Sequence, residues 1–353
     1  MFIRGLGTAT PERRYSQPEC LEALQATEIY ARLEHRSRTL LRKLLNGSNG
    51  ISGRYLALDP LAEMSEFTPD ALHRRFSRHA PALATEAARR ALADSGLEAT
   101  DIDGVVVSTC TGYLCPGLSG YVIEGLGLRK SVTALDLVGH GCAAALPNLR
   151  AGEALLADTA CRHVISVCVE VCSAAFYIDD DPGVLISACL FGDGAGAAVL
   201  SQSPAPERRR VEWKAYYSLT DPSHRDALRF EQRHGMLRNI LTPTVPKLAA
   251  GYSLRILAAM AAATGLDPRG INGWIVHAGG RDVLRELAGQ LGLNDHDLRW
   301  SRKALDHYGN LSSPFVLFVL QAALAANASS GWWWLSSFGA GFSCHGAILS
   351  VGD

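Results

Sequence analysis

The chain has 353 residues, a length that predicts two packed halves when about 150 residues are taken as one domain. Hydrophobic residues make up 48% of the chain and charged residues 20%, so it can bury a large interior. The formal net charge of −1 excludes the strongly basic surface on which nucleic-acid binding depends, and we expect no nucleic-acid partner.

The nine cysteines predict a reducing compartment. Their number is odd, no two form a Cys-x-x-Cys pair, and several lie in apolar runs such as HVISVCVEVCSAAFY. This pattern is typical of buried thiols, not of a disulfide framework or a metal site. The first residues, MFIRGLGTATPERRY, lack the apolar stretch of a signal peptide, and the late apolar run FVLFVLQAALAA is too short to cross a bilayer. We therefore predict a cytoplasmic protein with no membrane partner.

Helices and buried strands alternate along the first half. An alanine-rich helical stretch (85–95) leads through a turn into an apolar strand (104–110). The turn HGCAAA (140–145) then opens a second helix (144–156). A glycine-rich turn, LFGDGAG, follows and enters another apolar strand; because no helix follows it, we interpret its glycines as turn residues and not as a phosphate loop.

The second half repeats this series in the same order, with the first two matches 169 and 168 residues apart. The matching pairs are GLEATDIDGVVVS with GLDPRGINGWIVH, HGCAAA with YGNLSS, and LFGDGAGAAVLS with SFGAGFSCHGAILS. An alanine-rich helix precedes the first member of each series, and a helix follows YGNLSS as one follows HGCAAA. An ordered series of matches predicts a duplicated α/β fold with two pseudo-symmetric halves, 1–203 and 204–353, each a mixed or parallel sheet covered by helices.

Cys142 is the first candidate for chemistry. It lies among small residues at a predicted helix start, where unpaired N–H groups and the helix dipole stabilise an anion. We expect a thiol in this position to have a lowered pKa and to act as a nucleophile near neutral pH. The alternative interpretation is a small core residue at the start of a helix.

His277 and Asn310 are the other two candidates. His277 ends a strand of the second repeat and precedes two glycines, which is typical of a side chain delivered from a strand end into a cleft. A core histidine bonded to the backbone is the alternative. Asn310 would also serve as a helix N-cap, but the duplication places it opposite Cys142. We therefore predict that Cys142 and Asn310 face each other across the junction of the halves.

Five segments resemble the successive signatures of type III polyketide synthases, the chalcone-synthase-like enzymes. They are GHGCAAALPNLRAGEAL, LFGDGAGAAVL, WIVHAGGRDVL, HYGNLSSPFVLFVL and SFGAGFSCHGAIL. The resemblance implies a thiolase-like αβαβα fold and a homodimer. It also implies that Cys142 accepts the acyl group, that His277 and Asn310 complete a triad, and that malonyl-CoA is condensed, with or without another acyl-CoA starter. The substrates would be CoA thioesters, with no metal or redox cofactor.

Departures from the family pattern concern the substrate pocket. Ala340 replaces the proline of the family's GFGPG segment. Two positions where plant members carry guarding phenylalanines fall at Arg238 and near Trp213, and the resemblance also places Ser312 in the pocket. Of the basic cluster that meets CoA in plant enzymes, Arg54 is the clearest remaining residue. A cation at position 238 would favour an acidic acyl group such as malonyl.

The segment LRFEQRHGMLRNILTPTVP resembles the bacterial branch that includes dihydroxyphenylacetyl-CoA synthase, which builds its ring from malonyl-CoA alone. The expected product is a cyclised polyphenol or an aromatic acyl-CoA such as 3,5-dihydroxyphenylacetyl-CoA. One alternative is a ketoacyl-ACP synthase III-like enzyme, which would depend on acyl carrier protein. Another is a non-catalytic acyl-binding paralogue, whose binding would survive replacement of Cys142 by alanine.

Overall fold

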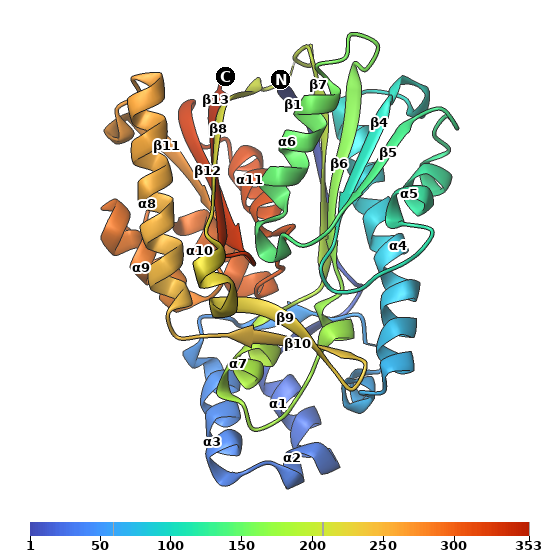
Figure 1. The fold of residues 1–353 in the computed structure, drawn as a ribbon, viewed down its shortest axis with the longest axis vertical. Helices are drawn as coiled ribbons and strands as arrows, with labels where there is room; N and C mark the ends of the chain where they lie inside the picture. The colour runs from blue at the N-terminus through green and yellow to red at the C-terminus, as the bar shows by residue number, and fades with distance from the viewer. Residues whose placement is uncertain (59, 207, 353) are drawn as a thin grey trace.

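The computed structural model describes residues 1–58, 60–206 and 208–352. Its main sheet has nine strands and consists of two parts that stand side by side, called here the first and the second sheet (Figure 1). The first sheet contains β1 (Phe2–Ala9), β7 (Gly194–Ser201), β6 (His163–Glu170), β4 (Gly104–Ser108) and β5 (Thr133–Leu137), in that order. The second contains β8 (Val211–Thr220), β13 (Ser343–Val351), β12 (Gly331–Gly339) and β11 (Ile271–Val276). A single pair, Phe2 with Glu212, joins β1 to β8 where the sheets meet.

The two sheets have the same strand directions when followed outward from that junction. In the first, β7 is antiparallel to β1 and β6, while β4 is parallel to β6 and β5. In the second, β13 is antiparallel to β8 and β12, while β11 is parallel to β12. This repetition confirms a duplicated α/β fold with mixed sheets. The expected division between residues 203 and 204 falls in the connection from β7 to β8, and the assignment of two domains stays a prediction.

Equivalent turns support the duplication. Helices α4 (Pro69–Ser95) and α8 (Val245–Thr264) both end at a glycine in the left-handed region, Gly96 with φ 68° and Gly265 with φ 71°. Glycine adopts this helix-ending conformation without a steric penalty, and the chain can then turn back into a strand. The two glycines begin the matched sequence segments, so the repeat in sequence corresponds to a repeat in structure.

A central layer of two helices separates the sheets, α6 (Ala145–Leu155) and α11 (Phe315–Ala325) (Figure 1). Residues 315–320 of α11 are all buried, because the helix contacts strands of both sheets. A helix that is apolar on every side is buried in this way. The late apolar run is therefore a central core helix. In the described ranges, no helix is both long enough and apolar enough to span a membrane.

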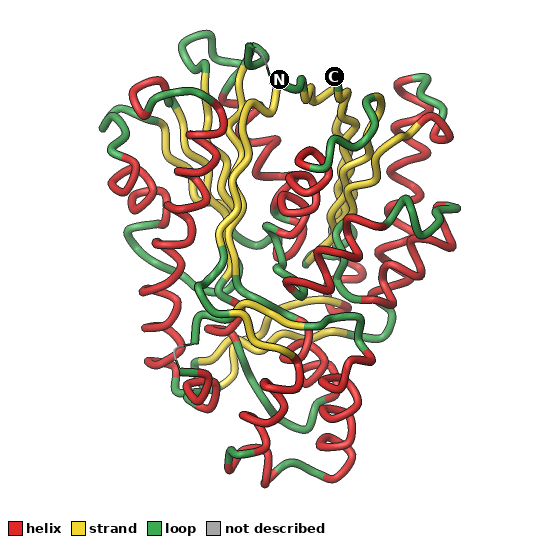
Figure 2. The backbone as a smooth tube through the Cα atoms, turned by 180° about the vertical axis from the view of Figure 1, so that it is seen from behind, coloured by secondary structure: helices red, strands yellow, loops and turns green. Residues whose placement is uncertain are grey.

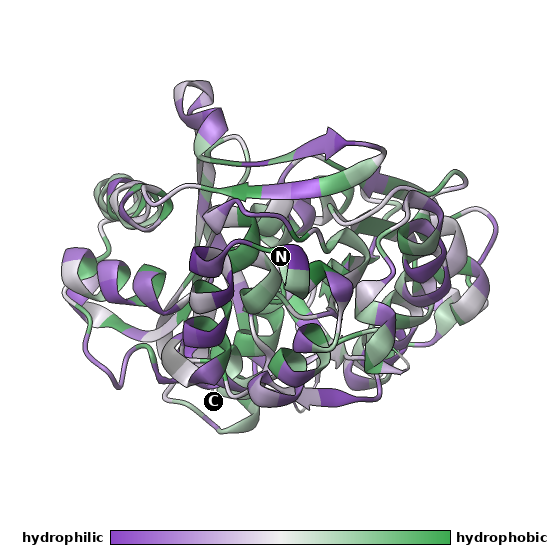
Figure 3. Cartoon of the chain, turned by 90° about the horizontal axis from the view of Figure 1, so that it is seen from below, coloured by the Kyte–Doolittle hydropathy of each residue, from purple (hydrophilic) through white to green (hydrophobic). Residues whose placement is uncertain are grey.

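The outer layers cover the other faces of the sheets. Helices α4 and α5 (Leu118–Leu126) pack on the first sheet, and α8 and α9 (Arg281–Leu291) lie outside the second. Helix α4 approaches β1 so closely that a Cβ on Gly7 would lie 2.3 Å from the carbonyl oxygen of Ala87. Hydrophobic residues concentrate on the inner elements and hydrophilic ones on the outer helices (Figure 3).

A cap of shorter elements closes one end of the sheets, opposite the two chain termini (Figures 1 and 2). It comprises α1 (Gln17–Gln25), α2 (Glu28–Arg32), α3 (His35–Lys43), α7 (Pro182–Leu190), the β2–β3 pair (Arg14–Ser16, Gly53–Tyr55) and the β9–β10 hairpin (Leu228–Arg233, Met236–Leu241). The parallel strands β4, β5, β6, β11 and β12 end beneath this cap. Ligands of α/β proteins bind at the carboxyl ends of such strands.

Candidate active site

Cys142 lies on the turn that joins β5 to α6. Gly139 and Gly141 have φ values of 91° and 56°, and a 3₁₀ turn over Gly141–Ala143 leads into α6. These left-handed values suit glycine and are costly for most other residues. The turn leaves Cys142 8% exposed, with its Sγ directed to the loop of the second half that carries Ser312.

Asn310 and Ser312 lie on the loop between α10 (Arg299–Tyr308) and α11. Ser312 has a φ of 61°, uncommon for a residue with a side chain, and its Oγ donates a hydrogen bond to Sγ of Cys142 at 3.2 Å. The Ser312 N–H donates to Oδ1 of Asn310 at 2.8 Å, and Nδ2 of Asn310 donates to the carbonyl of Gly279 at 3.3 Å. Ser312 therefore links Cys142 and Asn310 across the junction of the halves.

His277 directly follows β11 and is 1% exposed. Its backbone N–H donates to the Ser336 carbonyl at 2.9 Å, which fixes the residue at the strand end. Its ring stands edge-on to Phe315 and Phe338, with centroids 5.3 and 5.0 Å away. Neither ring nitrogen has a hydrogen-bond partner within the described part of the chain. Because buried polar atoms are nearly always paired, this exception favours a functional role over a core histidine.

Two contacts bring the His277 strand end to the nucleophile. Asn310 bonds to Gly279, two residues after His277. Phe338, which touches the His277 ring, precedes Gly339, where an added Cβ would lie 2.5 Å from the Ala143 nitrogen. Glycine at position 339 thus allows β12 to approach the residue that follows Cys142.

The expected low pKa of Cys142 is wrong for this structure. Burial raises the pKa of Cys142 to about 12, and the hydrogen bond from Ser312 offsets only part of that rise. Loss of solvation of the thiolate outweighs the favourable helix start. Burial also lowers the pKa of His277 to about 3. At neutral pH both groups are therefore neutral, and a thiolate forms only when a proton leaves the thiol.

Alkylation of Cys142 by iodoacetamide is expected to accelerate about tenfold per pH unit between about pH 6 and pH 9. The thiolate reacts, and below the pKa its fraction rises tenfold per unit, so a raised pKa removes any plateau in this range. Mass spectrometry of the Cys142 peptide measures the rate, with the exposed Cys115 as an internal reference. A rate that is already constant near pH 7 would contradict the raised pKa.

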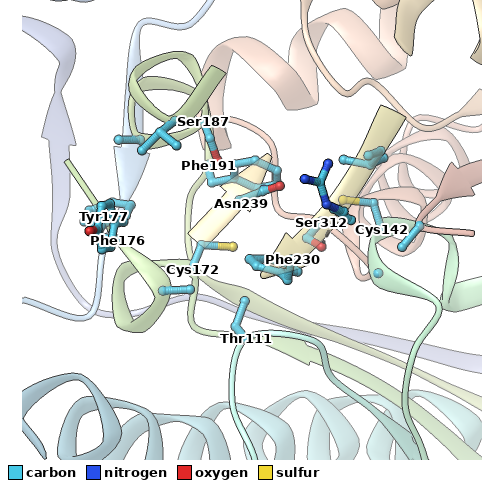
Figure 4. Close-up of a pocket in the computed structure, with 17 residues that line it drawn as sticks. Thr111, Cys142, Cys172, Phe176, Tyr177, Ser187, Phe191, Phe230, Asn239 and Ser312 are labelled. Carbon is cyan, nitrogen blue, oxygen red and sulfur yellow. Dashed lines mark hydrogen bonds between the residues drawn. The ribbon is translucent and has the colours of Figure 1, made fainter. Parts of the chain in front are cut away.

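A mostly apolar chamber opens beside Cys142 (Figure 4). Cys142 and Ser312 stand at one end of it, and Phe176 and Tyr177 at the other. The aromatic lining also includes Phe191 and Phe230, and the polar lining includes Thr111 and Asn239. Residues 228–230 of β9 line both this chamber and a larger outer cleft of about 780 Å³. Thr111, Gly141 and Ala340 also line both spaces, so the outer cleft reaches the residue before the nucleophile.

A buried carboxyl group, missed in the sequence, lies at the end of β6. Glu170 is 0% exposed and accepts hydrogen bonds from Ser313 Oγ at 2.5 Å, Thr111 Oγ1 at 2.9 Å and the Cys110 N–H at 3.0 Å. Burial raises the pKa of Glu170, and these donors offset part of the rise. A single acidic residue in the apolar run SVCVEVC was the signal, since a carboxyl in a buried strand requires partners.

The structure contradicts the proposed pocket role of Arg238. Its side chain is 10% exposed and forms ion pairs with Glu231 at 2.7 Å, Asp179 at 3.1 Å and Asp181 at 3.2 Å. Alternate residues of a strand face opposite sides, so the next residue, Asn239, lines the chamber in its place. With three carboxylates around it, Arg238 is not a free cation that would select an acidic acyl group.

Trp213 also lies outside the chamber. It is 4% exposed on β8, pairs with Leu349 of β13, and stacks on Tyr216 with ring centroids 5.9 Å apart. Trp213 and Tyr216 are three residues apart and would face opposite sides of a regular strand. A bulge in the β8–β13 register between Ile348 and Leu349 brings both to one face. Ser312 does line the chamber, as the resemblance placed it, and its role stays a prediction.

Arg54 does not meet solvent as a CoA-binding residue would. It is 2% exposed, and its guanidinium donates to the carbonyls of Ala188 at 2.7 Å and Phe191 at 2.8 Å and to Oε1 of Gln17 at 3.1 Å. The two carbonyls belong to the last turn of α7 and its C-cap, where a helix leaves acceptors without partners. Arg54 therefore caps α7, and the CoA-entrance assignment is wrong.

Replacement of Arg54 by alanine is expected to lower the free energy of unfolding by about 3 kcal/mol, because several buried acceptors lose their donor. If Arg54 bound a CoA phosphate, loss of about 1.4 kcal/mol at that contact would raise the Kd for CoA tenfold. Because Arg54 caps α7 instead, we expect the Kd for CoA to change far less. Urea denaturation and CoA titration measure the two quantities. A variant with unchanged stability and much weaker CoA binding would restore the entrance assignment.

Two family models match successive parts of the chain. The family described as "FAE1/Type III polyketide synthase-like protein" matches residues 8–223, and "Chalcone and stilbene synthases, C-terminal domain" matches residues 237–351. The chain belongs to the type III polyketide synthase family. It has the thiolase-like fold of these enzymes and is a condensing enzyme of the acyltransferase class.

Bacterial relatives of this polyketide synthase cover nearly the whole chain. This chain is 31% identical over 333 residues to 3,5-dihydroxyphenylacetyl-CoA synthase of Streptomyces toyocaensis, and the match covers 91% of this chain and 82% of the relative. It is 27% identical over 363 residues to "Alpha-pyrone synthesis polyketide synthase-like Pks18" of Mycobacterium tuberculosis, covering 99% and 91%. The crystal structure of 1,3,6,8-tetrahydroxynaphthalene synthase from Streptomyces coelicolor A3(2) superposes with a TM-score of 0.89 at 25% identity, covering 100% and 99%.

Proposed function

We propose that this enzyme condenses malonyl-CoA iteratively on Cys142 and releases a cyclised polyphenol or an aromatic acyl-CoA such as 3,5-dihydroxyphenylacetyl-CoA. The contact of Ser312 with both Cys142 and Asn310 supports this assignment. So do the two ring nitrogens of His277, which have no hydrogen-bond partner among the described residues. The similarity to bacterial 3,5-dihydroxyphenylacetyl-CoA synthases supports malonyl-CoA as both starter and extender.

The first step is acyl transfer to Cys142. His277 accepts the thiol proton, and the thiolate attacks the thioester carbon of the acyl-CoA. The C–S bond to CoA breaks, the CoA sulfur takes the proton from His277, and a new thioester forms on Cys142. Burial lowers the pKa of His277, so the imidazole is neutral before this step. The same burial disfavours the imidazolium, and attraction between the new thiolate and the protonated ring offsets that cost.

The second step is decarboxylation of malonyl-CoA. The bond to the carboxylate breaks, CO₂ leaves, and its electron pair forms an enolate on the thioester. N–H groups of His277 and Asn310 donate to the enolate oxygen, and Phe315 and Phe338 keep water from the imidazole. Fixed donors in a dry site contribute roughly 3–4 kcal/mol each. The enolate carbon then attacks the acyl group on Cys142, which returns the thiolate and lengthens the chain by two carbons.

Incubation of the pure protein with carbon-labelled malonyl-CoA alone tests this function, with mass spectrometry of the products. A labelled aromatic product built only from malonyl units is the expected result. Absence of any ketide, with malonyl-CoA alone and with added acyl-CoA starters, would refute it. Turnover that requires acyl carrier protein would support the ketoacyl-ACP synthase III-like alternative instead.

We also propose that the enzyme is a cytoplasmic homodimer. Strand β5 forms the outer edge of the first sheet and is largely exposed, and apolar side chains surround it: Tyr113 is 71% exposed and Val138 67%. An unpaired apolar edge is a site for pairing with another chain, here a second copy. Light scattering measures the mass, and Val138→Lys is expected to favour the monomer. The nine free cysteines fit a reducing cytoplasm.

A further inference from the structure

A column of aromatic rings leads from the core of the second sheet to the nucleophile turn. Trp213 stacks on Tyr216 at 5.9 Å, and Tyr216 lies nearly parallel to His345 at 6.0 Å with an interplanar angle of 9°. The ring of His140, two residues before Cys142, stands edge-on to His345 at 6.1 Å. The column therefore ends on the turn that holds the reactive thiol.

His345 occupies a defined place beneath that turn. It lies opposite Ser337 in the β12–β13 register, and Ser337 Oγ donates to the carbonyl of Ala143 at 2.9 Å. The residues before and after it in the strand face the other way: Cys344 Sγ is 3.5 Å from Ser253 Oγ on α8. Ser337 thus bonds to Ala143, the residue after Cys142. The ring of His345 meets His140, two residues before Cys142.

At position 345, an imidazole that only filled space would make the protein less stable than an apolar side chain of similar size. His345 is 3% exposed; its Nδ1 is 2.9 Å from the Tyr216 hydroxyl, and its Nε2 has no partner within the described part of the chain. An unpaired buried nitrogen destabilises a protein, whereas leucine would fill a similar volume without it. The Tyr216 hydrogen bond orients the ring, which a leucine side chain could not reproduce.

We propose that His345 is a positioning residue for Cys142: held by Tyr216, its ring supports His140 and so fixes the Gly139–Cys142 turn. This inference rests on the proposed role of Cys142 as nucleophile. His345 is not among the residues that line the chamber, so it acts through the turn. Its loss should therefore move the thiol without removing any group that binds substrate.

The experiment compares His345→Leu, His345→Asn and Tyr216→Phe, with Cys344→Ala as the matched control on the opposite face of the same strand. His345→Leu is expected to lower kcat about 10- to 100-fold with an unchanged KM for malonyl-CoA, because small displacements of a reacting atom have effects of this size. Iodoacetamide alkylation of Cys142 should slow by a similar factor. His345→Asn, which keeps a hydrogen-bonding atom near the position of Nδ1, should recover most of the loss.

Tyr216→Phe keeps the ring stack and removes the hydroxyl, so it should give a smaller loss in the same two measurements. Cys344→Ala should lower Tm but leave both rates unchanged. The proposal is overturned if the His345→Leu variant has the wild-type kcat and the wild-type rate of Cys142 alkylation. It is also overturned if both rates fall in proportion to Tm and the His345→Asn variant does not restore them. Alkylation requires no malonyl-CoA, so it tests the positioning even if the proposed condensation fails.

Discussion

Replacement of Cys142 by alanine is expected to abolish ketide formation, with a loss of about 10³-fold or more. The variant lacks the atom that carries the growing chain, and removal of a covalent nucleophile has effects of at least this size. Mass spectrometry of the intact protein after incubation with malonyl-CoA should show an acyl adduct on the wild type and none on the variant.

Cys20→Ala is the matched control for this change. Cys20 is also buried, but it lies on α1 in the cap and lines neither the chamber nor the outer cleft. The Cys20→Ala variant should be somewhat less stable than the wild type and should keep its activity. Ketide formation by Cys142→Ala at the wild-type rate would show that another group carries the chain. Acyl binding without turnover in the wild type would support a non-catalytic paralogue.

Replacement of His277 by leucine is expected to slow decarboxylation of malonyl-CoA about 10²- to 10³-fold, since one donor to the enolate oxygen is lost. Stability should stay the same or rise by about 1 kcal/mol, because leucine fills a similar space and removes two buried nitrogens that have no partner in the described residues. Release of labelled CO₂ and thermal unfolding measure the two effects.

The two variants separate the two steps. Decarboxylation needs no thiol, so Cys142→Ala should still convert malonyl-CoA to acetyl-CoA, whereas His277→Leu should not. If His277→Leu lost stability and kept decarboxylation, His277 would be an ordinary core residue. This result would also remove the proposed explanation for its two unpaired nitrogens.

The sequence predicted those features that depend on local pattern and on repetition. Gly96 and Gly265 end equivalent helices because each sequence repeat carries a glycine where the chain must enter the left-handed region. The alternation of apolar strands and alanine-rich helices was enough to predict two α/β halves. The same repetition placed Cys142 and Asn310 at equivalent turns, which Ser312 joins in the structure.

The errors concern features that depend on side-chain direction and burial. Arg238 was assigned to the pocket, but strand alternation turns it to three carboxylates and brings Asn239 to the chamber. A bulge places Trp213 on the inner face of β8, and Arg54 caps a helix 134 residues distant in sequence. None of these partners is visible to a local pattern.

The pKa of Cys142 best separates what the sequence determined from what the tertiary structure decided. The position of the thiol before a helix is a local property, and the glycines and alanines around it specify that position. Whether its thiolate is stable depends on how much water reaches Sγ and on groups from distant strands, such as Glu170. Packing of the second half over the turn excludes that water and raises the pKa, so only the assembled fold determines the charge of the thiol.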